Sequence, residues 1–232
     1  MSKKILVSGG NGRFANELKK INSRYQFIFR NKKQFNILSL KSIKNNFKKF
    51  KPHIVLHLAG LSRPMSIHDK KINKSIDLNI IGTANLVKLC NLFNKKIIFF
   101  STSYIYPGKK GNYKETDPVL PWNNYGWSKL GAESAVQMYK NSLIIRACMT
   151  EKPFIHKYAF NNVKSNFIFH DQIARYLIKL INKKGVFNVG GKTQTIFKFA
   201  KTYNRKVKKT KSKGELPLNM DMNLKKLKRN LS

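Results

Sequence analysis

Acidic residues, cysteines and long apolar runs are all scarce in this sequence of 232 residues. Cys90 and Cys148 are the only cysteines, and they lie far apart in apolar surroundings, which indicates buried thiols in a reducing compartment. No apolar run approaches the roughly 20 residues that a membrane-spanning helix needs. The apolar run near the N-terminus is too short for a signal peptide. We therefore expect a cytoplasmic protein without a transmembrane segment.

The shortage of acids leaves a large positive charge. Ten Asp and Glu face 47 Lys and Arg, a formal net charge of +37, so nucleic acid or another polyanion is a candidate partner. The lysines are, however, spread through the chain among abundant Asn, Ile and Phe. We therefore regard nucleic acid as an unlikely partner. The charge is densest in residues 204–232, where we expect a solvated, flexible segment and a short basic helix.

Strand-like and helix-like patterns alternate along the chain, and 41% hydrophobic residues suffice for a core. Short apolar runs predict strands at 3–8, 25–30, 53–60, 96–102, 142–147 and 185–191. Helical patterns occupy 12–21, 40–50, 72–94, 123–140 and 170–181. This alternation predicts an α/β fold, a Rossmann-type doubly wound parallel sheet.

A glycine-rich turn follows the first predicted strand. In SGGNGRFA, residues Gly9, Gly12 and Ala15 fit the spacing G-x-x-G-x-x-[G/A]. Such spacing allows a tight turn and the close approach of a pyrophosphate to the start of a helix. Because the turn lies between a strand and a helix, we interpret it as a dinucleotide-binding turn.

A tyrosine and a lysine share one helix face further along. Tyr125 and Lys129 are four residues apart, and the hydroxyls of Ser101, Thr102 and Ser103 end the fourth predicted strand. Alone, such a pair is common and can be two ordinary surface residues. With the glycine-rich turn it predicts proton transfer coupled to hydride transfer at a nicotinamide. We expect the lysine charge to lower the tyrosine pKa.

These motifs resemble the extended short-chain dehydrogenase/reductases. The resemblance rests on SGGNGRFA, HLAG (57–60), LNIIGTANL (78–86), STSYIY (101–106), YKETDPVLPWNNYGWSK (113–129) and GVFNVGG (185–191). The order of the motifs is most similar to the dTDP-4-dehydrorhamnose reductase branch. The resemblance implies reduction of a nucleotide-linked 4-keto sugar, with a nucleotide-sugar 4-epimerase as the alternative. A non-catalytic cofactor-binding or polyanion-binding protein is a second alternative.

The resemblance also implies roles for single residues. Thr102, Tyr125 and Lys129 match the catalytic set, and Asn79 matches a helix residue near the active site. The expected cofactor-binding residues are Gly9, Gly12, Arg13, Phe14, Arg30, Asn36, Ile37, Gly60, Leu61, Ser62, Tyr125 and Lys129. Thr102, Ser103 and Met149 are the expected substrate-binding residues, although the branch usually has Asp in place of Ser103 and an aromatic residue in place of Met149.

Two further expectations concern the cofactor and the domains. Arg30 ends the second strand and two lysines follow it without a nearby carboxylate, which favours NADP(H) over NAD(H). We predict a cofactor-binding domain over 1–145 that includes the catalytic residues, and a small, reduced substrate-binding part over 146–232. A homodimer is compatible with the resemblance. The five histidines show no ligand pattern, so we expect no metal site.

Overall fold

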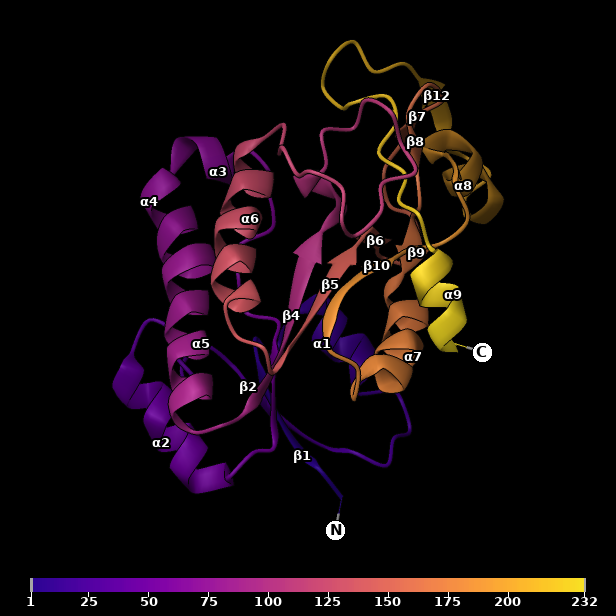
Figure 1. Cartoon of the computed structure of the whole chain (residues 1–232). Helices are drawn as coiled ribbons and strands as arrows, with labels where there is room; N and C mark the ends of the chain where they lie inside the picture. The colour runs from indigo at the N-terminus through magenta and orange to yellow at the C-terminus, as the bar shows by residue number, and fades with distance from the viewer. Residues whose placement is uncertain (1, 232) are drawn as a thin grey trace.

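A six-stranded parallel sheet lies at the centre of the molecule (Figure 1). The computed structural model describes residues 2–231. In spatial order the strands are β2 (Gln26–Arg30), β1 (Lys4–Ser8), β3 (Ile54–His57), β4 (Lys96–Thr102), β5 (Ser142–Ala147) and β10 (Gly185–Val189). All neighbouring strands run parallel. The predicted Rossmann-type doubly wound sheet is confirmed.

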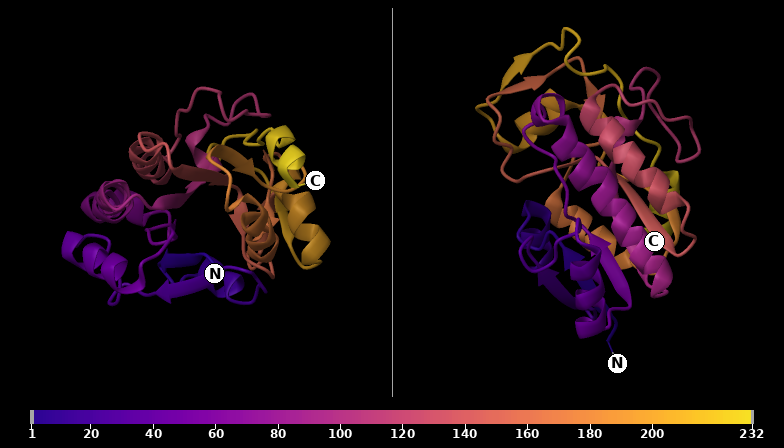
Figure 2. Two further views of the ribbon diagram at one scale, coloured as in Figure 1. Left: turned by 60° about the horizontal axis from the view of Figure 1, so that its bottom comes forward. Right: turned by 90° about the vertical axis from the view of Figure 1, so that its left-hand side faces the viewer.

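Helices cover both faces of this sheet (Figure 2). One layer consists of α1 (Arg13–Leu18), α7 (His170–Leu180) and α9 (Lys225–Leu231). The other consists of α2 (Leu40–Phe50), α5 (Gly82–Leu92) and α6 (Asn124–Gln137). Alternate residues of a strand serve opposite layers: Ile5 and Val7 pack toward the first, Leu6 toward the second. Strands buried on both faces are apolar at nearly every position, as the sequence predicts.

The long helical pattern expected over 72–94 is confirmed, and it contains a π turn. Residues 72–92 are helical without a break and comprise α4 (Ile72–Ser75), the π-helical turn η1 (Ile76–Ile81) and α5. The short helix α3 (Ile67–Lys70) precedes them. Asn79 of η1 bonds the main chain of Leu61, and the Thr83 hydroxyl donates to the Asn79 carbonyl at 2.6 Å. These bonds hold the wide turn against the loop that follows β3, and π turns are frequent at functional sites.

Short strand pairs and one helix lie above the carboxyl ends of the sheet, at the upper right in Figure 1. The pairs are β6 (Met149–Thr150) with β9 (Ile168–Phe169), β7 (Tyr158–Phe160) with β12 (Lys208–Thr210), and β8 (Lys164–Ser165) with β11 (Gln194–Thr195). They accompany α8 (Ile196–Tyr203), and the 3₁₀ turn η2 (Ser103–Ile105) follows β4. The predicted division into two domains at 145/146 stays a prediction. Strand β10, from the predicted C-terminal part, belongs to the central sheet.

The C-terminal segment is not the flexible tail that its lysines suggest. Val207, Met220, Met222 and Leu227 are each about 2% exposed or less. Leu227 belongs to α9, which confirms the predicted short basic helix and packs against α7 and β10. The prediction of a solvated segment is wrong because a few well-spaced apolar residues reach the core while the lysines between them remain outside.

Candidate active site

The glycine-rich turn brings the end of β1 against the end of β3. Gly9 has φ +72°, and the Gly12 amide donates to the Gly9 carbonyl at 2.9 Å. A Cβ on Gly9 would lie 2.6 Å from the Ala59 nitrogen. Glycine is therefore required at position 9 both by the backbone conformation and by the loop that follows β3. Gly12 follows as the N-cap of α1.

Gly9→Ala tests this close approach, with Gly185→Ala as its control. Both glycines have positive φ, but a Cβ on Gly185 would meet nothing within 4 Å. We expect Gly185→Ala to lower the free energy of unfolding by about 1–2 kcal/mol, the cost of left-handed backbone alone. Gly9→Ala adds a clash with β3 and should cost about 2–5 kcal/mol. Urea denaturation followed by circular dichroism measures both, and equal losses would contradict the packing argument.

The residues after the turn divide between core and surface. Phe14 is buried, and its ring lies 4.8 Å from that of Phe100 between centroids, so its side chain serves the core. Arg13 is exposed and forms an ion pair with Glu151, in the loop after β6. Of the two residues, Arg13 therefore has the side chain that can reach a ligand.

At the end of β2, Arg30 lies over the ring of Phe50, with 5.1 Å from the guanidinium carbon to the ring centroid. Its Nε is buried and finds no hydrogen-bond partner within residues 2–231. Asn36 accepts from the Leu38 amide at 3.1 Å, and Ile37 is buried against Gly82. The side chains of Asn36 and Ile37 thus support a turn and the core, and their cofactor roles stay predictions.

The loop after β3 is held by one asparagine. The Asn79 side chain accepts from the Leu61 amide at 2.6 Å and donates to the Leu61 carbonyl at 3.0 Å. Gly60 lies beside the same side chain, since a Cβ there would come within 3.0 Å of Asn79 Oδ1. Ser62 follows and is exposed. Asn79 therefore positions the three residues that the sequence assigns to the nicotinamide side.

Two of the three predicted catalytic residues come together at the carboxyl end of β4. Thr102 ends that strand, and its hydroxyl lies near the phenol of Tyr125, in the first turn of α6. Lys129 follows one turn later, with its Nζ 4.1 Å from the centroid of Phe99. Tyr125 lies between two other rings, His68 at 5.1 Å and Tyr104 at 5.9 Å between centroids.

Burial dominates the electrostatics of this set. Desolvation raises the pKa of Tyr125 above its ordinary value, although the Thr102 hydroxyl and the charge of Arg63 act in the opposite direction. The expectation of a lowered tyrosine pKa is therefore wrong for this structure. Desolvation also lowers the pKa of Lys129 to about 7, against the opposing charge of Glu133. A phenol that retains its proton at neutral pH can act as an acid.

A buried polar chain continues behind Tyr125. The Ser128 hydroxyl donates to the Tyr125 carbonyl and accepts from the Asn79 amide, both at 2.8 Å. The Asn79 carbonyl in turn accepts from the Thr83 hydroxyl. Ser128 lies inside the Y-G-x-S-K motif, so that motif already contained the signal for its role.

The chain then reaches the switch point of the sheet, between β1 and β3. The Thr83 hydroxyl donates its hydrogen to the Asn79 carbonyl, so it accepts from His57 Nε2–H at 2.9 Å. In this tautomer His57 Nδ1 carries no hydrogen, and it accepts from the Ser8 hydroxyl at 2.9 Å. Burial lowers the pKa of His57 to about 3, so the ring remains neutral. The sequence offered no sign of this role, because His57 there lacks any ligand pattern.

The predicted substrate-side residues lie apart from this chain. Ser103 is buried in η2, and Met149 is partly buried against the core that contains α7. Their contact with a substrate stays a prediction. Within residues 2–231 no group of three or more His, Cys, Asp and Glu could hold a metal ion. No helix of the described chain is long and apolar enough to cross a membrane.

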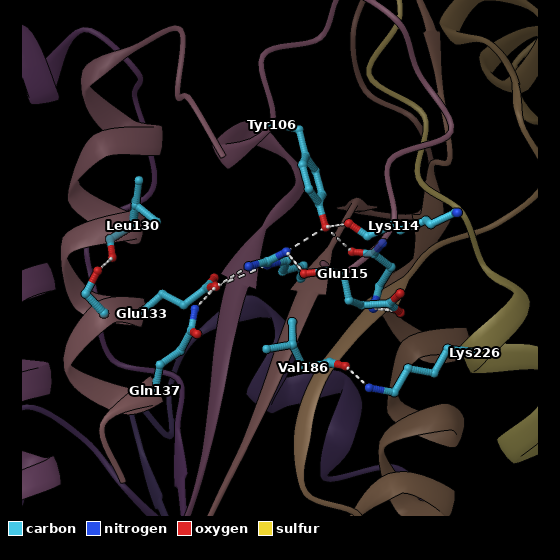
Figure 3. A network of polar contacts seen from close by, with 11 residues as sticks. Tyr106, Lys114, Glu115, Leu130, Glu133, Gln137, Val186 and Lys226 are labelled. Carbon is cyan, nitrogen blue, oxygen red and sulfur yellow. Dashed lines mark hydrogen bonds and ion pairs between the residues drawn. The ribbon is translucent and has the colours of Figure 1, made fainter. Parts of the chain in front are cut away.

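An ion pair inside the fold fixes α6, the helix that carries Tyr125 and Lys129. Arg146 of β5 donates from Nε and Nη2 to Glu133 Oε1, at 3.1 and 2.7 Å. Its Nη1 donates to the Tyr106 hydroxyl at 2.7 Å (Figure 3). The two charged side chains are 4% and 0% exposed. The pair joins α6 to β5, and one turn of α6 separates Glu133 from Lys129.

Comparison with known families agrees with this architecture. The sequence pattern described as "RmlD substrate binding domain" matches residues 3–150, more than half of the chain. The chain belongs to this family. The match covers the glycine-rich turn, the loop after β3 and the whole set of Thr102, Tyr125 and Lys129.

Individual relatives match part of the chain. Methionine adenosyltransferase 2 subunit beta of Pongo abelii is 30% identical over 103 residues, which is 44% of this chain and 30% of that protein. dTDP-4-dehydrorhamnose reductase of Aggregatibacter actinomycetemcomitans is 26% identical over 152 residues, 63% of this chain and 51% of that protein. The chain thus spans about half or less of the length of these two relatives.

Among solved structures, dTDP-4-dehydrorhamnose reductase from Bacillus anthracis, in complex with NADP, has a TM-score of 0.89. It is 20% identical, and the match covers 99% of this chain and 92% of that one. At this identity the likeness establishes the fold.

Proposed function

We propose that this protein is an NAD(P)H-dependent reductase of a nucleotide-linked 4-keto sugar. The observation that carries the proposal is the placement of Thr102 near Tyr125 at the carboxyl end of β4, beside the switch point of the sheet, with Lys129 one helical turn further along α6. Membership of the RmlD substrate binding domain family and the likeness to two dTDP-4-dehydrorhamnose reductases support it.

The residues around the crevice fit a nicotinamide dinucleotide. Gly9 and Gly12 form a turn without side chains at the start of α1, where a pyrophosphate can approach the main chain. Arg30 ends β2, where this fold class places the adenosine ribose, and its Nε has no hydrogen-bond partner among residues 2–231. We infer a preference for NADP(H) over NAD(H), because an arginine favours a ribose 2′-phosphate.

Reduction of a ketone requires a hydride at carbon and a proton at oxygen. A bound reduced nicotinamide supplies the hydride. The Tyr125 hydroxyl donates the proton to the forming alkoxide, and the raised pKa of Tyr125 keeps that proton in place beforehand. Thr102 donates a hydrogen bond to the same oxygen. Lys129, when protonated, stabilises the phenolate that remains.

A second candidate is a cofactor-binding assembly partner without turnover. The match to methionine adenosyltransferase 2 subunit beta, a protein named as a subunit, favours it, although the match is confined to 44% of this chain. The complete Thr102, Tyr125 and Lys129 set favours an enzyme, because a scaffold has no need of a proton donor. A homodimer is tested separately, by analytical ultracentrifugation of the protein with and without NADPH.

The decisive experiment uses purified protein and a panel of dTDP-, UDP-, GDP- and CDP-linked 4-keto sugars. We expect loss of NADPH absorbance with at least one substrate, and tighter binding of NADPH than of NADH in a fluorescence titration. Interconversion of sugar epimers without net NADPH consumption would replace the reductase by a 4-epimerase. Cofactor binding without turnover of any substrate would favour the assembly partner.

A further inference from the structure

Two arginines, one after β1 and one after β3, hold one carboxylate. Arg13 begins α1, directly after the glycine-rich turn, and Arg63 lies in the loop after β3, directly after Ser62. Both donate from Nη1 to Glu151 Oε1, Arg63 at 3.1 Å and Arg13 in a shorter contact. We refer to Arg13, Glu151 and Arg63 as the Arg–Glu–Arg bridge.

The bridge lies over the switch point. Its arginines follow β1 and β3, which are neighbours in the sheet. The strand order changes direction between them, because β2 lies on one side of β1 and β3 on the other. Ligands of open α/β sheets bind outside the carboxyl ends of such strands. A planar guanidinium binds a carboxylate and a phosphate through the same donors. The Glu151 carboxylate therefore provides the two arginines with a negatively charged hydrogen-bond acceptor, as a phosphate group would.

Acidic residues are scarce in this chain. There are ten of them against 47 basic residues, and two arginines share one of these acids here. Without a partner the two neighbouring guanidinium groups would repel each other. The three side chains remain 48%, 25% and 38% exposed for Arg13, Glu151 and Arg63, so water screens the ion pairs and a stronger anion can replace the carboxylate.

We propose that Glu151 occupies the place of a phosphate, that the diphosphate of the dinucleotide displaces it, and that Arg63 then binds this diphosphate together with Arg13. The inference rests on the proposed function, because it requires a dinucleotide in the crevice. Glu151 thereby weakens cofactor affinity and keeps the two arginines in position when no cofactor is bound.

Glu151→Gln is the direct test. It removes the competing charge and should tighten NADPH binding by about three- to tenfold, the range of one or two partly exposed ion pairs. Glu17→Gln is the matched control, because Glu17 of α1 pairs with Lys20 on the surface and loses the same charge without freeing Arg13 or Arg63. Adenosine, which lacks phosphate, should bind wild type and Glu151→Gln equally.

A double-mutant cycle tests the role of Arg63. Arg63→Gln should weaken NADPH binding. When Arg63→Gln is already present, Glu151→Gln should increase NADPH affinity by less than it does in wild type, because one of the two arginines that it releases is missing. Isothermal titration at two salt concentrations measures these affinities. Additive effects would show that Arg63 and Glu151 act independently and would overturn the proposal.

Thermal unfolding supplies a readout independent of turnover. Without ligand, Glu151→Gln should melt below wild type, since both arginines lose their charged partner. With saturating NADPH the order should reverse or the difference vanish. If wild type binds neither NADPH nor NADH, the proposed function itself fails. If wild type binds and Glu151→Gln binds no tighter, the role of Glu151 is wrong while the proposed function stands.

Discussion

Tyr125→Phe is expected to lower turnover of the keto-sugar substrate by about 10²- to 10⁴-fold, the contribution of a positioned general acid. The substitution removes one oxygen, the phenol oxygen near Thr102, and leaves the ring packed beside His68 and Tyr104. Dinucleotide affinity should stay within about twofold, or about 0.4 kcal/mol, because the ring of Tyr125 and the other expected cofactor-binding residues remain. Steady-state kinetics and an NADPH titration measure the two quantities.

Tyr139→Phe provides the matched control. Tyr139 lies just beyond the other end of α6, and its hydroxyl donates to the Cys90 carbonyl at 3.3 Å. The variant loses the same atom, but near the opposite end of α6 from Tyr125, and should retain turnover. Unchanged turnover in Tyr125→Phe would exclude Tyr125 as the proton donor. Equal losses in both variants would mean that α6 is merely sensitive to substitution.

Glu133→Gln is expected to produce the largest loss of stability. It leaves the guanidinium of Arg146 buried without a countercharge, and breaking a buried pair on one side costs about 3–5 kcal/mol. The matched control is Asp171→Asn. That aspartate pairs with Arg175 on the surface of α7, where an ion pair contributes about 1 kcal/mol or less. Urea denaturation of the two variants gives the comparison.

A double variant separates charge from packing. Replacing Glu133 and Arg146 together by Leu and Met removes both charges, and such replacements are often neutral or stabilising. We expect it to recover most of the stability that Glu133→Gln loses. If the double variant is as unstable as the single one, the hydrogen bonds of Arg146 to Tyr106 and to the Glu115 carbonyl, and not its charge, hold this region.

The local patterns predicted the scaffold well. The alternation of Ile5, Leu6 and Val7 between two cores, and the spacing of Gly9 and Gly12, depend on backbone geometry over a few residues. Tyr125 and Lys129 depend on one helical turn. A reader of the sequence can therefore find these features without knowing which distant segments come together.

Short-range patterns were misleading where long-range contacts compete with them. The helical stripe over 72–94 did not reveal the π turn, because Asn79 bonds Leu61, which precedes it by 18 residues. The lysines of residues 204–232 concealed Met220 and Met222, whose burial depends on surfaces contributed by earlier segments. The raised pKa of Tyr125 likewise results from desolvation by the whole fold, whereas its neighbour Lys129 is visible in the sequence.

The sequence by itself determined the α/β class, the motifs at the strand ends and the residues that can perform proton transfer. Each of these features depends on neighbours within one helical turn or one strand. Tertiary structure alone decided which charges meet across distant segments. Glu133 pairs with Arg146 across 13 residues, and Glu151 pairs with Arg13 across 138 and with Arg63 across 88. Pairs within one helix, Glu17 with Lys20 and Asp171 with Arg175, follow the helical spacing. The long-range pairs have no such spacing, so with 47 basic residues available for ten acids their partners depend on where the folded backbone places them.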